Sequence, residues 1–208
     1  NNSFSDELRM LSNLTVFVDI EDGSLGTDFK EESGVRYGVL GIDGSVRAGA
    51  EVNMSEYEGM FEAIHGNASV SGGKDNTILF AVPVYKGYNV KYVLYKLYDS
   101  EVLAQKIDLS CFDGAGESVV TDLDANIVLR ETESTIQKSF FENEQNLEIF
   151  GEIMEKMNIS SAAAGCSKSS MGDNILFMAE TDYAGLYVRG YVPEEVVSEE
   201  ISLIVPLV

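Results

Sequence analysis

The residues best suited to binding a small molecule are five tyrosines in one short stretch of the chain. They are Tyr85, Tyr88, Tyr92, Tyr95 and Tyr98. Each combines an apolar ring with a hydroxyl group, which suits a pocket that must orient a small polar ligand. On a β-strand, Tyr92 and Tyr98 would lie on one face and Tyr95 on the other. The alternative is that the rings only pack on the sheet, and the sequence leaves both interpretations open.

Residues for catalysis or metal binding form no recognisable pattern. His65 is the single histidine, and it lies at the expected end of a helix, where its charge would interact with the helix dipole. The motifs G-x-S-x-G and G-x-x-x-x-G-K-S/T do not occur. Carboxylates are so frequent that no catalytic pair can be singled out. The D-L-D-A-N segment at 122–126 lacks the glycine and distal glutamate of a calcium loop. We therefore expect no catalytic residue, no metal and no cofactor.

Composition narrows the classes of partner. The formal net charge is -21, from 14 basic and 35 acidic residues, so the surface would repel a phosphate backbone and nucleic acid is excluded as a partner. Solubility in an exposed compartment explains this acidity better than an acidic interaction surface does. Cys111 and Cys166 match no metal-ligand spacing, and the sequence leaves open whether they form a disulfide or stay free thiols.

The chain contains an internal repeat. One copy begins with N-T-I-L-F and covers 76–107, and the other begins with D-N-I-L-F and covers 173–201. Phe80 aligns with Phe177 at an offset of 97, whereas Val102 aligns with Val196 at an offset of 94. The difference falls in a turn, where changes of length are tolerated. Each copy reads as a strand, a turn, a second strand and the start of a helix, so one structural unit is predicted twice in series.

A second pair of matching segments precedes these copies. Strands predicted at 36–40 and 45–48 flank the turn containing Asp43, and strands at 119–122 and 127–130 flank the turn containing Asp124, at an offset of 81. A helix follows the first pair, with Ser55 as its N-cap and Gly66 at its end. A longer helical region is predicted over 133–158, and the small polar residues of 160–172 predict a loop.

These elements predict an α+β fold in which an antiparallel sheet carries helices across one face. The expected parts are an N-terminal helix and loop over 1–34, a first module over 35–112 and a second module over 113–208. The first helix is expected over 6–20, because Leu8, Leu11 and Leu14 form an apolar stripe. An exit helix is expected from Pro193 to Ile201. The apolar run at 201–208 reads either as the approach to a membrane segment or as a buried chain end.

This order of elements resembles the PAS-like module of Cache sensor domains, and two modules in series resemble a double Cache domain. The phrases that carry the resemblance are G-V-L-G-I-D-G-S, F-A-V-P-V-Y, V-L-Y-K-L-Y-D and V-T-D-L-D-A-N-I-V-L. They resemble those of Cache domains that precede bacterial diguanylate cyclases and sensor kinases. The resemblance covers residues 6–205. It departs from the family in having a short first helix.

The resemblance implies a ligand in the first, membrane-distal module, between the sheet and its covering loops. Carried over to this chain, the candidate ligand-binding residues are Arg47, Phe80, Tyr85, Tyr92 and Asp99, with Asp99 as a partner for an amine. The amine-and-carboxylate motif of amino-acid-binding Cache domains is not clearly present, so amino acids are not the favoured ligands.

The resemblance further implies an extracytoplasmic sensing domain of a bacterial transmembrane protein, held at the membrane by flanking spans and without catalysis of its own. The expected output is a diguanylate cyclase, and the alternatives are a sensor histidine kinase or a chemoreceptor. A secreted or surface-attached binding module is an alternative of another class, and an enzyme using clustered carboxylates is the least favoured. The sequence leaves open the ligand and whether the domain acts as a homodimer.

Overall fold

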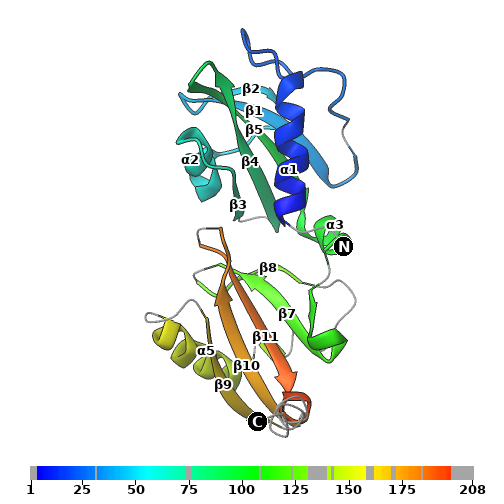
Figure 1. Cartoon of the computed structure of the whole chain (residues 1–208), viewed down its shortest axis with the longest axis vertical. Coiled ribbons are helices and arrows are strands. Elements are labelled where there is room, and N and C mark those ends of the chain that lie inside the picture. Colours follow the sequence, from blue (N-terminus) through cyan, green and yellow to red (C-terminus); the bar gives the residue numbers. More distant parts are fainter. Residues whose placement is uncertain are drawn as a thin grey trace, which may run out of the picture. The chain divides into compact units, whose positions relative to one another are not determined.

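The computed structural model describes residues 4–30, 32–73, 76–107, 109–122, 124–130, 140–141, 143–157, 162–169, 172–183 and 185–197, and it gives the backbone alone at 110, 113 and 166–169. The chain divides into two compact units (Figure 1). The first contains residues 1–107 with 182–186, and the second contains 108–181 with 187–208. Within the described residues, no helix is both long enough and apolar enough to span a membrane.

The first unit is built on an antiparallel sheet of five strands in the order β2-β1-β5-β4-β3. Its strands are β1 (Val35–Gly41), β2 (Val46–Gly49), β3 (Ser69–Gly72), β4 (Thr77–Lys86) and β5 (Asn89–Asp99). The predicted turn joins β1 to β2, and Gly44 has the positive φ of +81° that such a turn requires. The long hairpin of β4 and β5 forms the middle of the sheet, as the apolar repeat predicts.

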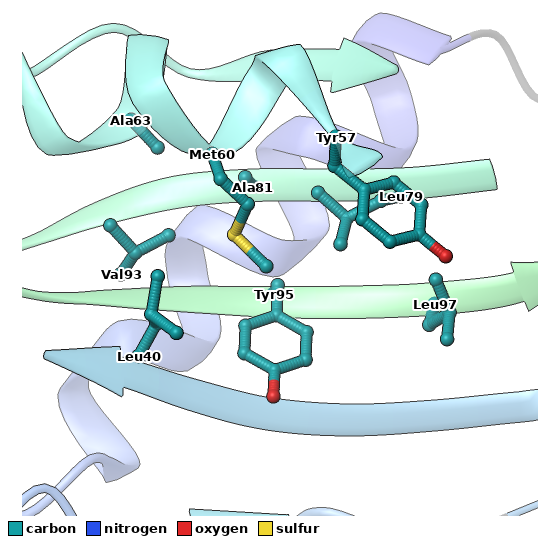
Figure 2. Close-up of a cluster of buried hydrophobic side chains, with 9 residues drawn as sticks. All are labelled: Leu40, Tyr57, Met60, Ala63, Leu79, Ala81, Val93, Tyr95 and Leu97. Carbon is teal, nitrogen blue, oxygen red and sulfur yellow. The ribbon is translucent and has the colours of Figure 1, made fainter. Parts of the chain in front are cut away.

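Helices cover both faces of this sheet. Helix α1 (Phe4–Leu14) packs on β4 and β5, and α2 (Glu58–Ile64) packs on β3, β4 and β5 (Figure 1). In Figure 2, α2 lies on one side of the strands and α1 on the opposite side. Because successive strand residues point to opposite faces, Leu79 and Ala81 face α2, whereas Phe80 and Val82 face α1. Helix α3 (Ser100–Ala104) follows β5 directly.

The second unit repeats this arrangement around a sheet of six strands. The main order is β6-β7-β11-β10-β9, and β8 pairs with β7. The strands are β6 (Ser110–Cys111), β7 (Gly116–Thr121), β8 (Ile127–Leu129), β9 (Ala162–Ser169), β10 (Gly172–Glu180) and β11 (Tyr187–Pro193). Helix α5 (Glu144–Met157) packs on β9 and β10, where α2 packs on the matching strands of the first unit.

The strand register confirms the predicted repeat. Phe80 lies on β4, which runs between β3 and β5, and Phe177 lies on β10, which runs between β9 and β11. Leu79 and Leu176 are both fully buried on the face that carries the helix of their unit. The α+β class and the tandem architecture are therefore confirmed.

Several local predictions were wrong. The segment predicted as a loop at 160–172 contains β9, which pairs with β10 along its length. Ser55 does not cap α2: it lies in a 3-10 helix (Met54–Glu56), whose cap is the Asn53 side chain. The first helix ends at Leu14, and a 3-10 helix (Thr15–Phe17) follows it.

Two further predictions are tested only in part. Pro193 ends β11, and residues 194–197 are helical, so the exit helix begins one residue later than expected. The remainder of that helix, the apolar run at 201–208 and all of 131–139 lie outside the described residues.

Candidate functional site

The face of the first sheet that carries α2 is a closed apolar cluster, here called the α2-side cluster. It consists of Leu40, Tyr57, Met60, Ala63, Leu79, Ala81, Val93, Tyr95 and Leu97 (Figure 2). Met60 and Tyr57 project from the α2 side toward the strands, and Tyr95 extends from β5 toward β1. No member is more than 7% exposed. A ligand could therefore enter between the sheet and α2 only by displacing these side chains.

Two tyrosine hydroxyls in the α2-side cluster have partners. The Tyr95 hydroxyl donates to the backbone oxygen of Ala50, and the Tyr57 hydroxyl lies 2.7 Å from Oγ1 of Thr77. Burial raises the pKa of Tyr95, with a smaller contribution from the charge of Glu51, so the phenol stays neutral and donates. At the edge of the cluster, the buried Oγ of Ser71 has no partner among the described residues, so it could bind a polar group of a ligand.

The opposite face holds a buried ion pair that joins α1 to the sheet. Glu7 is 2% exposed, and its Oε2 accepts hydrogen bonds from Nζ of Lys96 at 3.0 Å and from the hydroxyl of Tyr98 at 2.7 Å. Burial acts to raise the pKa of Glu7, but the bonds from Tyr98 and Lys96 outweigh it and lower that pKa. The Lys96 ammonium also lies 4.5 Å from the centre of the Tyr98 ring. This network is satisfied within the protein, which makes it a structural tie between α1 and β5.

Two of the five residues predicted to bind ligand lie together. A side chain at Gly23 would come within 3.1 Å of both Arg47 and Tyr92, so these two residues flank one point of the loop that follows α1. The Tyr92 hydroxyl donates to the backbone oxygen of Glu21 at 3.1 Å. Arg47 pairs with Asp43 at 2.6 Å, and its side chain is 41% exposed.

The other three predicted residues lie elsewhere in the first unit. Phe80 packs edge-on against Tyr98 beneath α1. Tyr85 is half exposed, and its hydroxyl donates to the backbone oxygen of Gly66 at 3.1 Å. Asp99 accepts a hydrogen bond from Arg36 at 3.0 Å, so a cation of the protein already occupies the place expected for a ligand amine. The five residues therefore do not converge on one pocket.

Sequence reasoning missed Glu7 and Lys96, although the sequence carries a signal for the first. Glu7 occupies one position of the helical stripe made by Phe4, Leu8 and Leu11, and a carboxylate within an apolar stripe requires a buried partner. Within the described ranges, no three His, Cys, Asp or Glu side chains are grouped so as to hold a metal ion.

Comparison with known proteins finds matches to solved structures only. No family model and no curated protein matches the sequence. The ligand-binding domain of the Pseudomonas aeruginosa amino acid chemoreceptor PctB, in complex with L-Gln, matches with a TM-score of 0.54 and 12% identity, over 99% of this chain and 91% of that chain. The ligand-binding domain of the Pseudomonas fluorescens chemoreceptor CtaA, in complex with L-leucine, matches with a TM-score of 0.55 and 12% identity, over 92% and 87%.

A third match has a ligand that is not an α-amino acid. The ligand-binding domain of the Pseudomonas aeruginosa chemoreceptor PctC, in complex with GABA, has a TM-score of 0.51 and 11% identity, over 90% of each chain. Both modules are covered by these alignments. The chain therefore has a tandem PAS-like fold, as its resemblance to double Cache domains implies.

Proposed function

We propose that this chain is the extracytoplasmic small-molecule sensing domain of a bacterial membrane signalling protein, and that it catalyses no reaction itself. The observation that carries this proposal is the shared fold, which extends over nearly the whole chain and includes both modules. The acidic surface, with a net charge of -21, is consistent with an exposed, soluble domain.

The binding residues that we propose in the first unit are Arg47 and Tyr92. They flank the same point at Gly23, and Arg47 is a partly exposed cation in a strongly acidic chain. A guanidinium beside an amphipathic ring can orient a ligand that has both an anionic group and an apolar part. Phe80, Tyr85 and Asp99 make their contacts away from this point, with Tyr98, Gly66 and Arg36 respectively, so they would act on the ligand only through neighbouring residues.

The sequence resemblance and the structural matches point to different output domains for the full-length protein. The sequence phrases resemble those of Cache domains attached to diguanylate cyclases, which remains the output that we propose. The solved neighbours belong to chemoreceptors, which supports the chemoreceptor alternative. In either case, binding would shift the balance between two packings of the domain and pass the change through flanking spans to the cytoplasm. The sequence that flanks this chain in the full-length protein decides between them.

The proposal is tested by thermal unfolding of the purified chain with amino acids, GABA and other small metabolites. A ligand that binds only the native state adds about 2.7 kcal/mol at a concentration of 100 Kd, and the melting temperature rises accordingly. Tyr92→Ala and Arg47→Gln should abolish that rise, whereas Tyr88→Ala, at a fully exposed position, should preserve it. If no compound acts at millimolar concentration, the sensing function is wrong. If a compound acts equally on Tyr92→Ala, only the assigned site is wrong.

A further inference from the structure

Arg189 is a buried cation at the centre of the second sheet. It lies on β11, is 6% exposed, and its guanidinium carbon is 5.5 Å from the centre of the Phe150 ring of α5. Phe150 and the register partners Met178 and Val119 belong to the α5-side cluster, which consists of Val119, Phe140, Phe141, Phe150, Ile153, Met157, Leu176 and Met178. A positive charge is thus placed among apolar and aromatic side chains.

The guanidinium of Arg189 lacks the partners that a buried charge requires. Among the described residues it makes no ion pair and no hydrogen bond, and its Nε is fully buried without a partner. Burial lowers the pKa of Arg189, and the negative charge of Asp122 only partly opposes this. The carboxylate of Asp122 is itself engaged by the backbone N and Nδ2 of Asn126, at 2.8 and 2.9 Å.

The repeat shows which residue occupies the equivalent position in the first unit. Ala81 and Met178 correspond in the two copies, and they pair with Tyr95 and Arg189 respectively. Arg189 therefore stands where the first unit has Tyr95, whose hydroxyl is bonded to Ala50. The same place in the fold is satisfied in one unit and unsatisfied in the other. An uncompensated buried charge is strongly destabilising, so a role in packing alone does not account for an arginine here.

A second unsatisfied group lies on the adjacent strand. Oγ1 of Thr121 is buried without a partner among the described residues, and Thr121 is 1% exposed. Arg189 pairs with Val119, and Thr121 pairs with Tyr187, so Arg189 and Thr121 are diagonal neighbours on the same face of the sheet. Side chains in this relation are within reach of one another when one of them is long. Two buried donors therefore face the same region.

We propose that Arg189 and Thr121 bind the carboxylate of a small organic acid in the second unit. A guanidinium binds a carboxylate through two parallel N–H···O bonds, and the threonine hydroxyl can donate a further one. The remainder of the ligand would be apolar, because the guanidinium lies by the ring of Phe150 and the register partners of Arg189 are Met178 and Val119. A single cation in such surroundings selects a monocarboxylate over a phosphate or a dicarboxylate, whose further charge would stay unpaired. The inference rests on the proposed sensing function, to which it adds a ligand class and a second site.

The test uses propionate and benzoate as probes, with propionamide and benzamide as neutral counterparts. Binding is measured by thermal shift and calorimetry, and the Nε–Hε resonance of Arg189 is followed by ¹⁵N NMR. The acids should raise the melting temperature and move that resonance, and the amides should do neither. Arg189→Met should weaken acid binding by at least about tenfold, because hydrogen bonds to a charged group are lost. Thr121→Val should weaken it by roughly threefold to tenfold.

The control is Arg130→Met, which removes an exposed arginine of the same unit and should leave binding unchanged. Arg189→Met is expected to fold, because an unpaired buried charge is replaced by an apolar side chain of similar length. Equal acid binding by Arg189→Met and the wild type would overturn the proposal. So would a failure of the wild type to bind either acid at millimolar concentration. In that case a response to another compound, abolished by Tyr92→Ala, would leave the proposed function standing.

Discussion

Replacing Glu7 by glutamine tests whether the buried ion pair holds α1 on the first sheet. Glutamine has the same shape, and its carbonyl oxygen can still accept the hydrogen bond from Tyr98. It cannot supply the negative charge that Lys96 meets at 3.0 Å. The two side chains are only 3% and 13% exposed, so water cannot readily replace the lost partner.

The magnitude follows from the contacts that change. One charge-assisted hydrogen bond to Lys96 is lost, worth about 1.5–3 kcal/mol, and the ammonium is left partly buried without its counter-charge. Removing one partner of a buried pair costs about 3–5 kcal/mol. Because Lys96 keeps its contact with the ring of Tyr98, we expect Glu7→Gln to destabilise the first unit by an amount near the lower limit, about 3 kcal/mol.

The assay is amide hydrogen exchange, read by mass spectrometry on peptides that cover α1 and β5. This reports the opening free energy of these elements separately from that of the second unit. Arg9→Gln is the matched control on the same helix, because its pair with Asp6 is exposed and should contribute less than about 1 kcal/mol. If Glu7→Gln lowers the opening free energy of α1 and β5 no more than Arg9→Gln does, the Glu7–Lys96 pair does not hold α1 on the sheet.

The same pair has a defined pH dependence. In the folded state the pKa of Glu7 lies below its ordinary value of 4.5, so the unfolded chain takes up the proton more readily. The contribution of Glu7 is therefore complete above pH 4.5 and is lost as the pH falls through the lowered value. In urea unfolding, the stability difference between wild type and Glu7→Gln should shrink below that pH. A difference that stayed constant down to acid pH would contradict the lowered pKa.

Two further predictions concern packing and reactivity. Gly38→Ala should destabilise the first unit by about 1–3 kcal/mol in chemical unfolding, because the added methyl group would overlap the ring of Tyr95. The control is Gly151→Ala on α5, where the added methyl group meets nothing within 4 Å. This variant should stabilise the protein by up to about 1 kcal/mol. A stable Gly38→Ala would contradict the packing of that ring. Burial raises the pKa of Cys111 to about 11. In a Cys166→Ser background, the Cys111 thiol of the folded protein should therefore react with a disulfide reagent at pH 8 far more slowly than the same thiol in the unfolded chain. Equal rates would refute the shielding of this thiol.

The sequence predicted the repeated architecture because the repeated strands are strongly apolar and keep the same spacing. The alternation along β5 likewise placed Tyr95 on one face and Tyr92 with Tyr98 on the other, as the register confirms. Strand β9 was missed because it is made of alanine, serine, glycine and similar small residues, whose strand preference is weak. Small residues are needed there: a side chain at Gly165 would come within 3.1 Å of Ile149, so a bulkier strand would push α5 away.

The contacts of the candidate ligand-binding residues were harder to predict, because the partners of these side chains depend on the tertiary structure. The structure brings Arg47 and Tyr92 to the same point at Gly23, and nothing in the spacing placed Arg36 against Asp99. The unusual position of Arg189 could have been recognised from the sequence. The offset of 94 that aligns Val102 with Val196 also aligns Tyr95 with Arg189, and a charge at the place of a tyrosine is a signal visible in the repeat.

Each sheet contains an aromatic ring that lies across a glycine on the neighbouring strand: Tyr95 over Gly38 in the first unit, and Phe177 over Gly190 in the second. The ring covers the backbone that the glycine leaves bare, and the glycine provides the space that the ring needs. Neither member of such a couple can be exchanged alone without a clash or a void. Among descendants of a common ancestor, the two positions should therefore vary jointly, and a lineage that gains a side chain at Gly38 or Gly190 should carry a smaller residue opposite it.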